Sequence, residues 1–267
     1  MLNQMRGVGD SNIPGIFVTT KEELEEKWKI HGIQAVYLID QIELLRVIKQ
    51  LGGACIYLEK QNGIICCEAA YIWQMSDETD LPDDTYIHRV WQRHMHLPWL
   101  ITKTEHLLLR ESVMEDLPCF QQFYKEERDN PDVQQLCEGE EQLRTYIAAR
   151  YPLFEYGLWT IVDKATGTVF GRAGIEELPE DYGDLAGEPE LSYLIGKEYR
   201  GSGIAKEACQ AILHYAAEEL EMKRIYLRTS RENFHSRKLA EKLGLLKVES
   251  ITEYKDLLYC GLLTFER

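Results

Sequence analysis

The chain has 267 residues, which is more than one average domain of about 100–150 residues contains and suggests two domains. Apolar residues make up 45% of the composition and charged residues 28%, so a fibrous or largely disordered protein is excluded. The formal net charge of −15 argues against nucleic-acid binding as the main function, because that binding depends on Lys and Arg neutralising phosphates. No apolar run approaches the roughly 18 residues that span a bilayer, and the seven cysteines lie in apolar settings typical of reduced thiols. We therefore expect a cytoplasmic protein without membrane or nucleic-acid partners.

Helix and strand patterns alternate along the first hundred residues. The segment from Thr20 to Gly32 predicts a helix, since Thr20 begins a capping box and a glycine ends the pattern. Further predicted elements are a strand over 35–39, a helix over 42–51 capped by Asp40, a strand over 54–59 and a helix over 83–96. We expect a small α/β domain over residues 1–104. It contains no motif that assigns a role, and extension of an acceptor site, formation of a homodimer and recognition of a second ligand all stay open.

The second part of the chain, residues 105–267, follows a linker that we place at Pro98 to Thr104, where the proline ends helical geometry. This part carries a net charge of −11, against −4 for residues 1–104. After a short strand over 107–110, Ser112 and Glu115 form a capping box that predicts a helix, and a second helix is predicted over 140–150. Runs of β-forming residues at 157–163 and 168–175 flank a four-residue turn and predict a hairpin.

A strand, a glycine-containing turn and a helix follow one another in the segment 190–216. The alternating strand 190–196 is followed by Arg200-Gly201-Ser202-Gly203-Ile204-Ala205, after which the apolar spacing predicts a helix. Unpaired amide groups and the positive end of the helix dipole favour an anion at such a helix start. Gly201 and Gly203 have no Cβ and allow the backbone to approach a phosphate. The alternative is an ordinary tight turn.

This turn resembles the Arg/Gln-x-x-Gly-x-Gly/Ala pyrophosphate loop of the GNAT acetyltransferases. Downstream, a strand over 224–229 and the block from Asn233 to Leu245 resemble the Asn-x-x-Ser/Ala…Glu-Lys-x-Gly-Phe helix of the same family. The resemblance covers residues 105–267 and is strongest to the branch that includes the ribosomal-protein alanine N-acetyltransferases. It implies an α+β fold, in which helices flank a mixed, bent β-sheet that two β-type runs at 246–253 and 257–265 complete.

The resemblance implies acetyl-CoA as the co-substrate and no metal. Three strand residues would pair through their backbone with the pantetheine arm, namely Tyr193, Leu194 and Ile195. The pyrophosphate would receive amide groups from the turn and the helix start, namely Gly201, Ser202, Gly203, Ile204, Ala205 and Lys206. Arg200 is either a phosphate contact or a solvated surface residue. Asn233 either holds the co-substrate near its thioester or caps the helix that it precedes, and the two roles are compatible.

Acetyl transfer to an amine requires a base, since a lysine amine has a pKa of about 10.4 and an α-amine a pKa of about 8. Glu190 matches the acidic position at the head of this strand in the ribosomal-protein branch, and the alternative is a solvent-facing strand-end carboxylate. Many relatives carry a general-acid tyrosine seven residues after the asparagine, where this chain has Ala240. Ser236 is the catalytic candidate that donates a hydrogen bond or orients a water, the alternative being a plain helix-surface serine. Tyr254 and Tyr259 are further candidates for the acid.

The segment 176–190 contains no Lys, Arg or His and seven acidic residues, namely Glu176, Glu177, Glu180, Asp181, Asp184, Glu188 and Glu190. It is either a solvated acidic loop or a field that attracts a cationic acceptor. We therefore predict acetyl transfer to a primary amine of a cationic small molecule, a basic peptide or a protein N-terminus, with a longer acyl donor left open. The alternative is an acyl-CoA-binding sensor with little catalysis, which the alanine at position 240 would suit. His88, His94 and His96 match no metal-site spacing.

Overall fold

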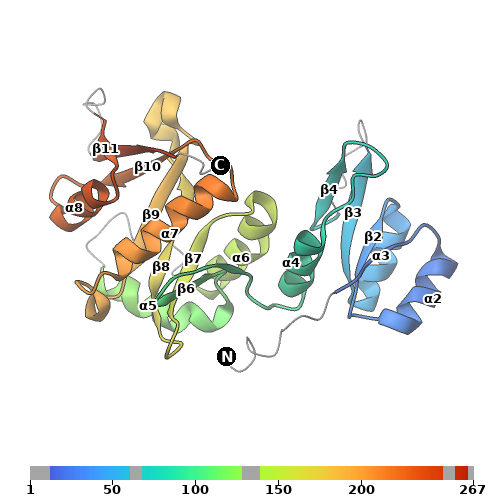
Figure 1. Ribbon diagram of the computed structural model, residues 1–267. Helices are drawn as coiled ribbons and strands as arrows, with labels where there is room; N and C mark the ends of the chain where they lie inside the picture. The colour runs from blue at the N-terminus through green and yellow to red at the C-terminus, as the bar shows by residue number, and fades with distance from the viewer. Residues whose placement is uncertain (1–12, 61–67, 128–138, 249–255, 264–267) are drawn as a thin grey trace. The chain divides into compact units, whose positions relative to one another are not determined.

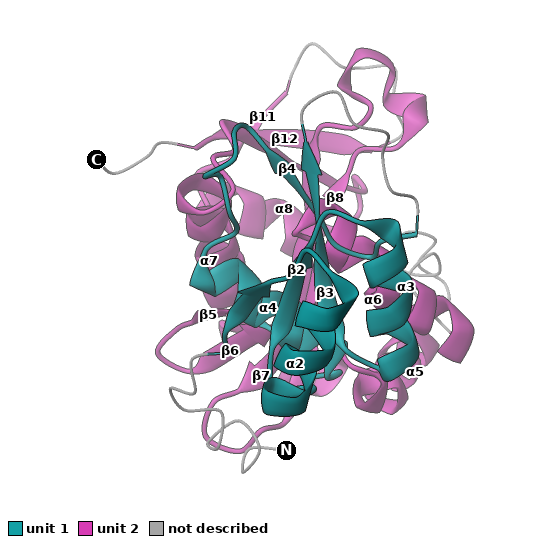
Figure 2. Ribbon diagram, turned by 90° about the vertical axis from the view of Figure 1, so that its right-hand side faces the viewer, with its two compact units in different colours: residues 1–99 teal, residues 100–267 magenta. Residues whose placement is uncertain are grey.

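The computed structural model describes residues 13–60, 68–127, 139–248 and 256–263 (Figure 1). The chain forms two compact units, residues 1–99 and 100–267, which Figure 2 shows in separate colours. The segment Leu100–Lys103, which the sequence analysis assigned to a linker, is instead a strand, β5, paired antiparallel with Leu107–Arg110. The linker prediction is therefore corrected: the chain leaves the helix near Pro98 and enters the second sheet directly. The second unit begins five residues before the predicted boundary at 105.

The first unit is a parallel sheet with helices on both faces (Figure 1). Its elements are β1 (Gly15–Phe17), α2 (Lys21–His31), β2 (Val36–Ile39), α3 (Ile42–Leu51), β3 (Ala54–Lys60), β4 (Ile72–Met75) and α4 (Asp84–His94). The strand order is β1-β2-β3-β4, and each neighbouring pair is parallel. The predicted strands and helices of this region are present, and the short strands β1 and β4 are additions that the sequence analysis did not predict.

The apolar residues of the first unit divide between two faces of the sheet. Tyr37 of β2 belongs to the cluster that α2 and α3 cover, whereas Leu38 belongs to the cluster that α4 covers. Alternating strand residues point to opposite faces, so buried apolar side chains on both faces are what a doubly covered parallel sheet requires. The predicted cap at Asp40 is wrong: α3 starts after Gln41 without a side-chain cap, and Asp40 forms an ion pair with Lys60 at 3.3 Å.

The second unit is built on an eight-stranded mixed sheet. Its strands are β5, β6 (Leu107–Arg110), β7 (Leu158–Asp163), β8 (Val169–Glu177), β9 (Pro189–Ile195), β10 (Arg224–Thr229), β11 (Leu246–Lys247) and β12 (Leu257–Leu262). Its helices are α5 (Leu117–Glu126), α6 (Glu140–Phe154), α7 (Ile204–Glu218) and α8 (Phe234–Lys242), with 3-10 turns η1 (Met114–Asp116), η2 (Glu180–Leu185) and η3 (Lys197–Tyr199). In the order β11-β12-β10-β9-β8-β7-β6-β5, every neighbouring pair among these described strands is antiparallel except β9 and β10. The predicted mixed sheet with flanking helices is confirmed.

Helices cover both faces of the second sheet. On one face α7 packs through Ala208 and Ile212 against Leu191 of β9, and on the other face Phe120 of α5 packs against Leu194. The side chains of β9 therefore alternate between the α7 face and the α5 face. Within the described residues, no helix combines the length and the apolar character needed to cross a bilayer.

A buried ion pair begins the helical segment after β6. The Nη1 and Nη2 atoms of Arg110 each donate to the Asp116 carboxylate at 2.7 Å, and the two side chains are each 3% exposed. The same carboxylate accepts the Val113 N–H at 3.0 Å, whereas the Ser112 N–H donates to the Tyr151 hydroxyl. The predicted capping box at Ser112 is therefore wrong. Buried Arg110 holds the Asp116 carboxylate where it accepts the Val113 N–H. Of the predicted closing strands, residues 249–255 and 264–265 lie outside the described residues.

Candidate active site

The parallel pair β9 and β10 separates soon after it starts. The two strands pair at one position, Glu190 opposite Tyr226, although each continues toward its carboxyl end. Beyond that position they border a cavity of about 630 Å³, which is lined by residues 191–195 of β9 and 227–229 of β10. Backbone groups that face a cavity in place of a neighbouring strand need another hydrogen-bonding partner. An extended ligand that carries amide groups would supply one.

The glycine turn lies at the start of α7 and faces the same cavity. Gly201 and Gly203 have φ values of 81° and 93°, in the left-handed region that side chains other than glycine rarely adopt. A Cβ added at either glycine would meet no atom within 4 Å, so the backbone here faces open space. Gly203 is the N-cap of α7 and offers no side chain to its first turn. The amide groups of that turn therefore face a cavity that suits an anion.

All the predicted site residues line this cavity except Ser202. The Ser202 hydroxyl donates to the Tyr199 carbonyl oxygen at 2.6 Å, which closes the turn internally. Arg200 is exposed, as the surface alternative predicts, and its guanidinium also has partners in the protein. Its Nε donates to the Ile195 carbonyl at 2.9 Å and its Nη2 to Glu127 Oε1 at 2.8 Å, so the guanidinium ties the end of β9 to the end of α5.

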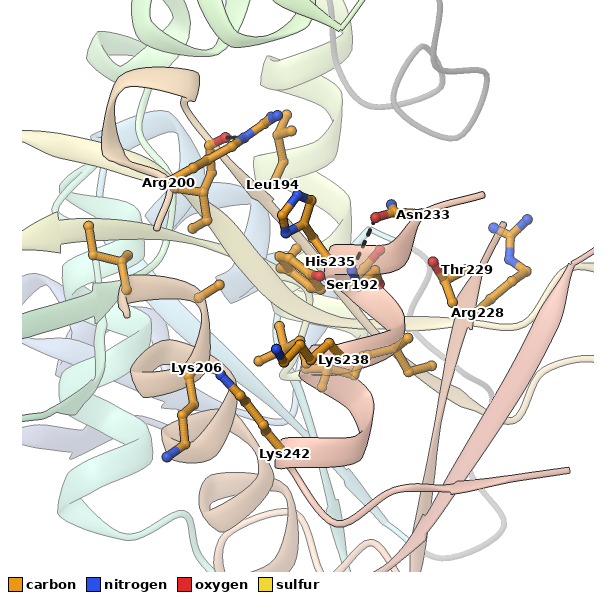
Figure 3. A pocket seen from close by; sticks show the side chains of 18 of the residues that line it. Ser192, Leu194, Arg200, Lys206, Arg228, Thr229, Asn233, His235, Lys238 and Lys242 are labelled. Carbon is orange, nitrogen blue, oxygen red and sulfur yellow. Dashed lines mark hydrogen bonds between the residues drawn. The ribbon is translucent and has the colours of Figure 1, made fainter. Parts of the chain in front are cut away.

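The start of α8 also lines the cavity, and Figure 3 labels its residues Asn233, His235 and Lys238. Asn233 caps the helix by accepting the Ser236 N–H at 3.1 Å, which confirms the capping alternative. Ser236 is 6% exposed, so the helix-surface alternative is wrong. Burial raises the pKa of Tyr193 to about 12, and the Ser236 hydroxyl opposes that shift. Ala240 lies one turn after Ser236 and is fully buried.

Two carboxylates face the cavity where β9 and β10 begin to separate. Glu190 is 6% exposed and accepts Arg228 Nε at 3.2 Å, so the predicted catalytic carboxylate is held in an ion pair and is not solvent-facing. Glu176 of β8 lies directly opposite Glu190 in the antiparallel ladder and also lines the cavity. Burial raises the pKa of Glu176, while Arg172 and Arg150 oppose that shift. Sequence reasoning missed this pairing because it placed Glu176 in a loop.

Positive side chains border a cavity in a chain of strongly negative net charge. They are Arg200, Lys206, Arg228, Lys238 and Lys242. Figure 3 shows Lys206, Lys238 and Lys242 well away from Arg228 and Thr229, which border the opposite end of the cavity. The sequence analysis did not single out Lys238 and Lys242, although their spacing of four residues places them on one face of α8. The cavity therefore has lysines on one side, which suit an anion, and Glu190 paired with Arg228 on another.

The acidic segment 176–190 is not a single loop. Glu176 and Glu177 end β8, and Glu190 lies in β9. Glu177 forms two hydrogen bonds of 2.8 Å with Arg150, and Glu188 lies 3.6 Å from Arg224. The prediction of one solvated acidic loop is therefore corrected, because strand pairing aligns its ends. Part of this charge is neutralised by arginines and part faces the cavity.

Two further expectations concern residues away from the cavity. Tyr259 is 3% exposed and does not line the cavity, and Tyr254 lies outside the described residues. His88 packs against aromatic rings, and His94 Nε2 lies 3.0 Å from the Gly52 carbonyl oxygen. In the part of the chain that the structure describes, no three His, Cys, Asp or Glu side chains converge as metal ligands.

The sequence model of the family described as "Acetyltransferase (GNAT) domain" matches residues 106–246. The chain belongs to the GNAT acetyltransferase family. The match begins at the start of β6 and ends at β11, so it contains the cavity and both of its helical walls. It leaves the whole first unit unmatched. The interrupted strand pair and the glycine turn both lie within the matched residues.

Named relatives and solved structures match the same region. "Uncharacterized N-acetyltransferase YjdG" of Bacillus subtilis is 30% identical over 101 residues, which are 38% of this chain and 58% of that protein. "Putative ribosomal N-acetyltransferase YdaF" of the same organism is 34% identical over 84 residues, 29% of this chain and 46% of that protein. The chain thus spans about half the length of the curated relatives that it matches. A RimL structure titled a ribosomal L7/L12 α-N-protein acetyltransferase in complex with coenzyme A has a TM-score of 0.50 at 15% identity, covers 62% of this chain and 98% of its own, and shows the shared fold.

Proposed function

We propose that this protein is an acetyl-CoA-dependent N-acetyltransferase that moves the acetyl group directly from the thioester to a primary amine. The observation that carries the proposal is the cavity between β9 and β10, which opens beside the glycine turn of α7 in a chain of the GNAT family. The first unit lies outside the family match. Its role, including any contribution to dimerisation, remains a separate hypothesis.

Acetyl-CoA fits the residues that border the cavity. Its pyrophosphate would accept hydrogen bonds from the amides of residues 201–206, where the α7 dipole and the open glycines favour an anion. Its pantetheine amides would pair with the backbone of residues 193–195, which face the cavity in place of a partner strand. The lysines on α7 and α8 add positive charge for a polyanionic co-substrate. Asn233 keeps its side-chain NH₂ for the co-substrate, since only its oxygen caps α8.

The acceptor amine would meet the acidic end of the cavity. One carboxylate takes a proton from the ammonium group, and the neutral nitrogen attacks the thioester carbonyl. The C–N bond forms, the C–S bond breaks, and the thiolate takes the second proton released by the nitrogen. A thiol with a pKa near 8.5 leaves without a strong acid, which suits a chain with Ala240 in the usual tyrosine position. Ser236 is the proposed hydrogen-bond donor on this wall, because it is buried and lines the cavity.

We infer a cationic amine as the acceptor, from the two cavity carboxylates and the acidic residues around them. The names of a relative and of a solved structure refer to ribosomal and α-N-protein acetyl transfer, so we include protein N-termini among the acceptors to test. We also infer a reducing, cytoplasmic location, because the described cysteines Cys55, Cys119, Cys209 and Cys260 are free thiols.

Acceptor-dependent release of CoA thiol from acetyl-CoA tests the proposal. The probes are spermidine and a lysine-rich peptide with a free α-amine, and the same peptide with every amine blocked is the control. We expect release with the free amines only. The buried alanine at position 240 favours the second candidate function, an acyl-CoA sensor. Thermal stabilisation by acetyl-CoA without acceptor-dependent release from either probe would support the sensor, and no stabilisation by CoA would reject both functions. Competition by longer acyl-CoAs determines the preferred acyl chain.

A further inference from the structure

We propose that Glu176 is the general base of this site and that Glu190, held by Arg228, positions the cationic amine. The inference rests on the proposed acetyl transfer and deepens it by dividing the work between two carboxylates. Sequence analysis pointed to Glu190 as the base. The structure instead shows two adjacent acids in different surroundings, which assigns them different roles.

The two carboxylates lie on neighbouring strands at matching positions. Glu176 and Glu190 are register partners in the antiparallel β8–β9 ladder. Side chains at such positions lie on the same face of the sheet, with Cβ atoms roughly 4.5–5.5 Å apart. Both line the cavity, and Glu190 is the last position at which β9 still pairs with β10. An ammonium group that enters at this point would therefore meet both carboxylates.

The two carboxylates differ in their ionic partners. Arg228 Nε donates to Glu190 at 3.2 Å and its Nη1 lies 3.7 Å from Asp256. A neighbouring guanidinium favours the charged carboxylate, so Glu190 is a better anionic contact for an ammonium group than a proton acceptor. Among the described residues, no ion pair or hydrogen bond reaches the Glu176 carboxylate. Glu176 is therefore available to accept a proton from a ligand in the cavity.

Besides Glu190 of β9, the charged groups around Glu176 come from three elements. Arg172 and Glu177 share β8 with it, Arg150 faces it from α6, and Arg228 faces it from β10. Tyr146 of α6 is also near enough to interact with its charge. Arg150 is occupied by two hydrogen bonds to Glu177, and Arg172 contacts the Phe120 ring and the Tyr124 hydroxyl. These arginines moderate the effect of burial without pairing directly with Glu176.

The net effect favours proton acceptance by Glu176. Burial raises the pKa of Glu176 and outweighs the opposing arginines. A carboxylate with a raised pKa accepts a proton more readily than an ordinary one, and general bases work best with a pKa near the working pH. In the step, the Glu176 carboxylate takes one proton from R–NH₃⁺ and becomes a carboxylic acid. The amine attacks acetyl-CoA, its second proton goes to the departing thiolate, and Glu176 later returns its proton to water.

Steady-state kinetics with spermidine and acetyl-CoA between pH 5 and 9 test this division. Glu176→Gln is expected to lower kcat by about 10²-fold or more and to remove the acid limb of the wild-type kcat profile. Glu190→Gln is expected to raise the KM for spermidine more than it lowers kcat, and to keep the acid limb. Glu219→Gln, an exposed acid at the end of α7, is the matched control and should match the wild type. CoA-dependent thermal stabilisation of each variant shows that the fold and the co-substrate site remain.

The proposal is overturned if Glu176→Gln keeps the wild-type kcat and acid limb, or if Glu190→Gln alone abolishes the limb. A readout without turnover separates this failure from failure of acetyl transfer itself. In protein labelled with ¹³C at the Glu side-chain carboxyls, we assign Glu176 by the signal lost in Glu176→Gln. We expect that signal to titrate above the ordinary glutamate range of about 4.3. Titration of Glu176 at or below that value rejects its role as base even if no acceptor is found.

Discussion

Two pairs of parallel strands in this protein have opposite outcomes. In the first unit, β2 and β3 pair at four successive positions, from Val36 opposite Ala54 to Ile39 opposite Tyr57, and all four residues of β2 are buried. In the second unit, β9 and β10 pair at one position and then border a cavity. The first pair satisfies its backbone internally and is covered by apolar side chains. The second leaves backbone groups facing a space that a substrate can enter.

The candidate site therefore depends on a local loss of strand pairing inside a well-packed sheet. On both sides of the gap the ladder continues, since β9 pairs with β8 at seven positions and β10 pairs with β12 at six. The neighbouring strands β8 and β12 hold β9 and β10 in place, although β9 and β10 pair with each other at only one position. The strands are therefore rigid enough to position a ligand, and the opening between them is built into the fold.

Substitution of Asp116 is expected to have the largest effect, and to destabilise the second unit alone. Asp116→Ala would leave Arg110 buried and without its partner, which typically costs about 3–5 kcal/mol. Hydrogen exchange should show that protection falls at amides of β6 and β7 and stays unchanged at amides of β2 and β3. Glu140→Ala, which removes an exposed ion pair with Arg144, is the control and should cost under about 1 kcal/mol. An equal loss of protection in both units would show that they do not unfold independently.

The next effect separates the glycine turn from an equivalent glycine in the first unit. Gly203→Trp should abolish the thermal stabilisation by CoA, which at a ligand concentration of 100 Kd corresponds to about 2.7 kcal/mol. Gly52→Trp is matched, since Gly52 also has positive φ and open space at its Cβ but terminates α3. It should lower the melting temperature without changing the increment given by CoA. If Gly203→Trp keeps the full increment, the phosphate does not bind at the α7 turn.

A smaller effect tests the contact between Tyr193 of β9 and Ser236 of α8, which joins the two walls of the cavity. Ser236→Ala removes a buried hydroxyl that affects the pKa of the Tyr193 phenol and should destabilise the protein by about 1–3 kcal/mol. Tyr193→Phe should cost a similar amount. Urea unfolding of the double variant should show a loss smaller than the sum of the two, because both changes remove one shared bond. Strictly additive losses would mean that the two hydroxyls do not interact.

The smallest effect concerns the stability that Glu176 costs. Because burial raises its folded-state pKa, the protein loses stability as pH rises from the ordinary glutamate range through that raised pKa. Glu176→Gln should therefore gain stability relative to the wild type at neutral pH, and the gain should vanish below about pH 4. Thermal melts at pH 4, 6 and 8 measure the difference, with Glu219→Gln as the exposed control. A gain that is constant across this range would show that ionisation of Glu176 is not its cause.

Much of the fold could be predicted because it follows from short-range patterns. The helix that Thr20 caps, the β7–β8 hairpin and the α8 cap at Asn233 all depend on residues within a few positions of one another. The failures involve partners that are distant in the chain or in space. Asp40 pairs with Lys60 of the adjacent strand and does not cap α3. Asp116, held by Arg110, accepts the Val113 N–H, and the predicted Ser112 cap does not form.

Sequence patterns alone were enough to identify the family, the glycine turn, and the cavity residues Asn233 and Ser236, because each motif is contiguous and its geometry is local. Only the tertiary structure decided how the carboxylates differ. Glu176 meets Glu190 through the register of β8 and β9, and Arg228 reaches Glu190 from a strand 38 residues later. Register and burial are set by packing of the whole sheet, so no local pattern separates a carboxylate held by arginine from one that faces the cavity without a partner among the described residues.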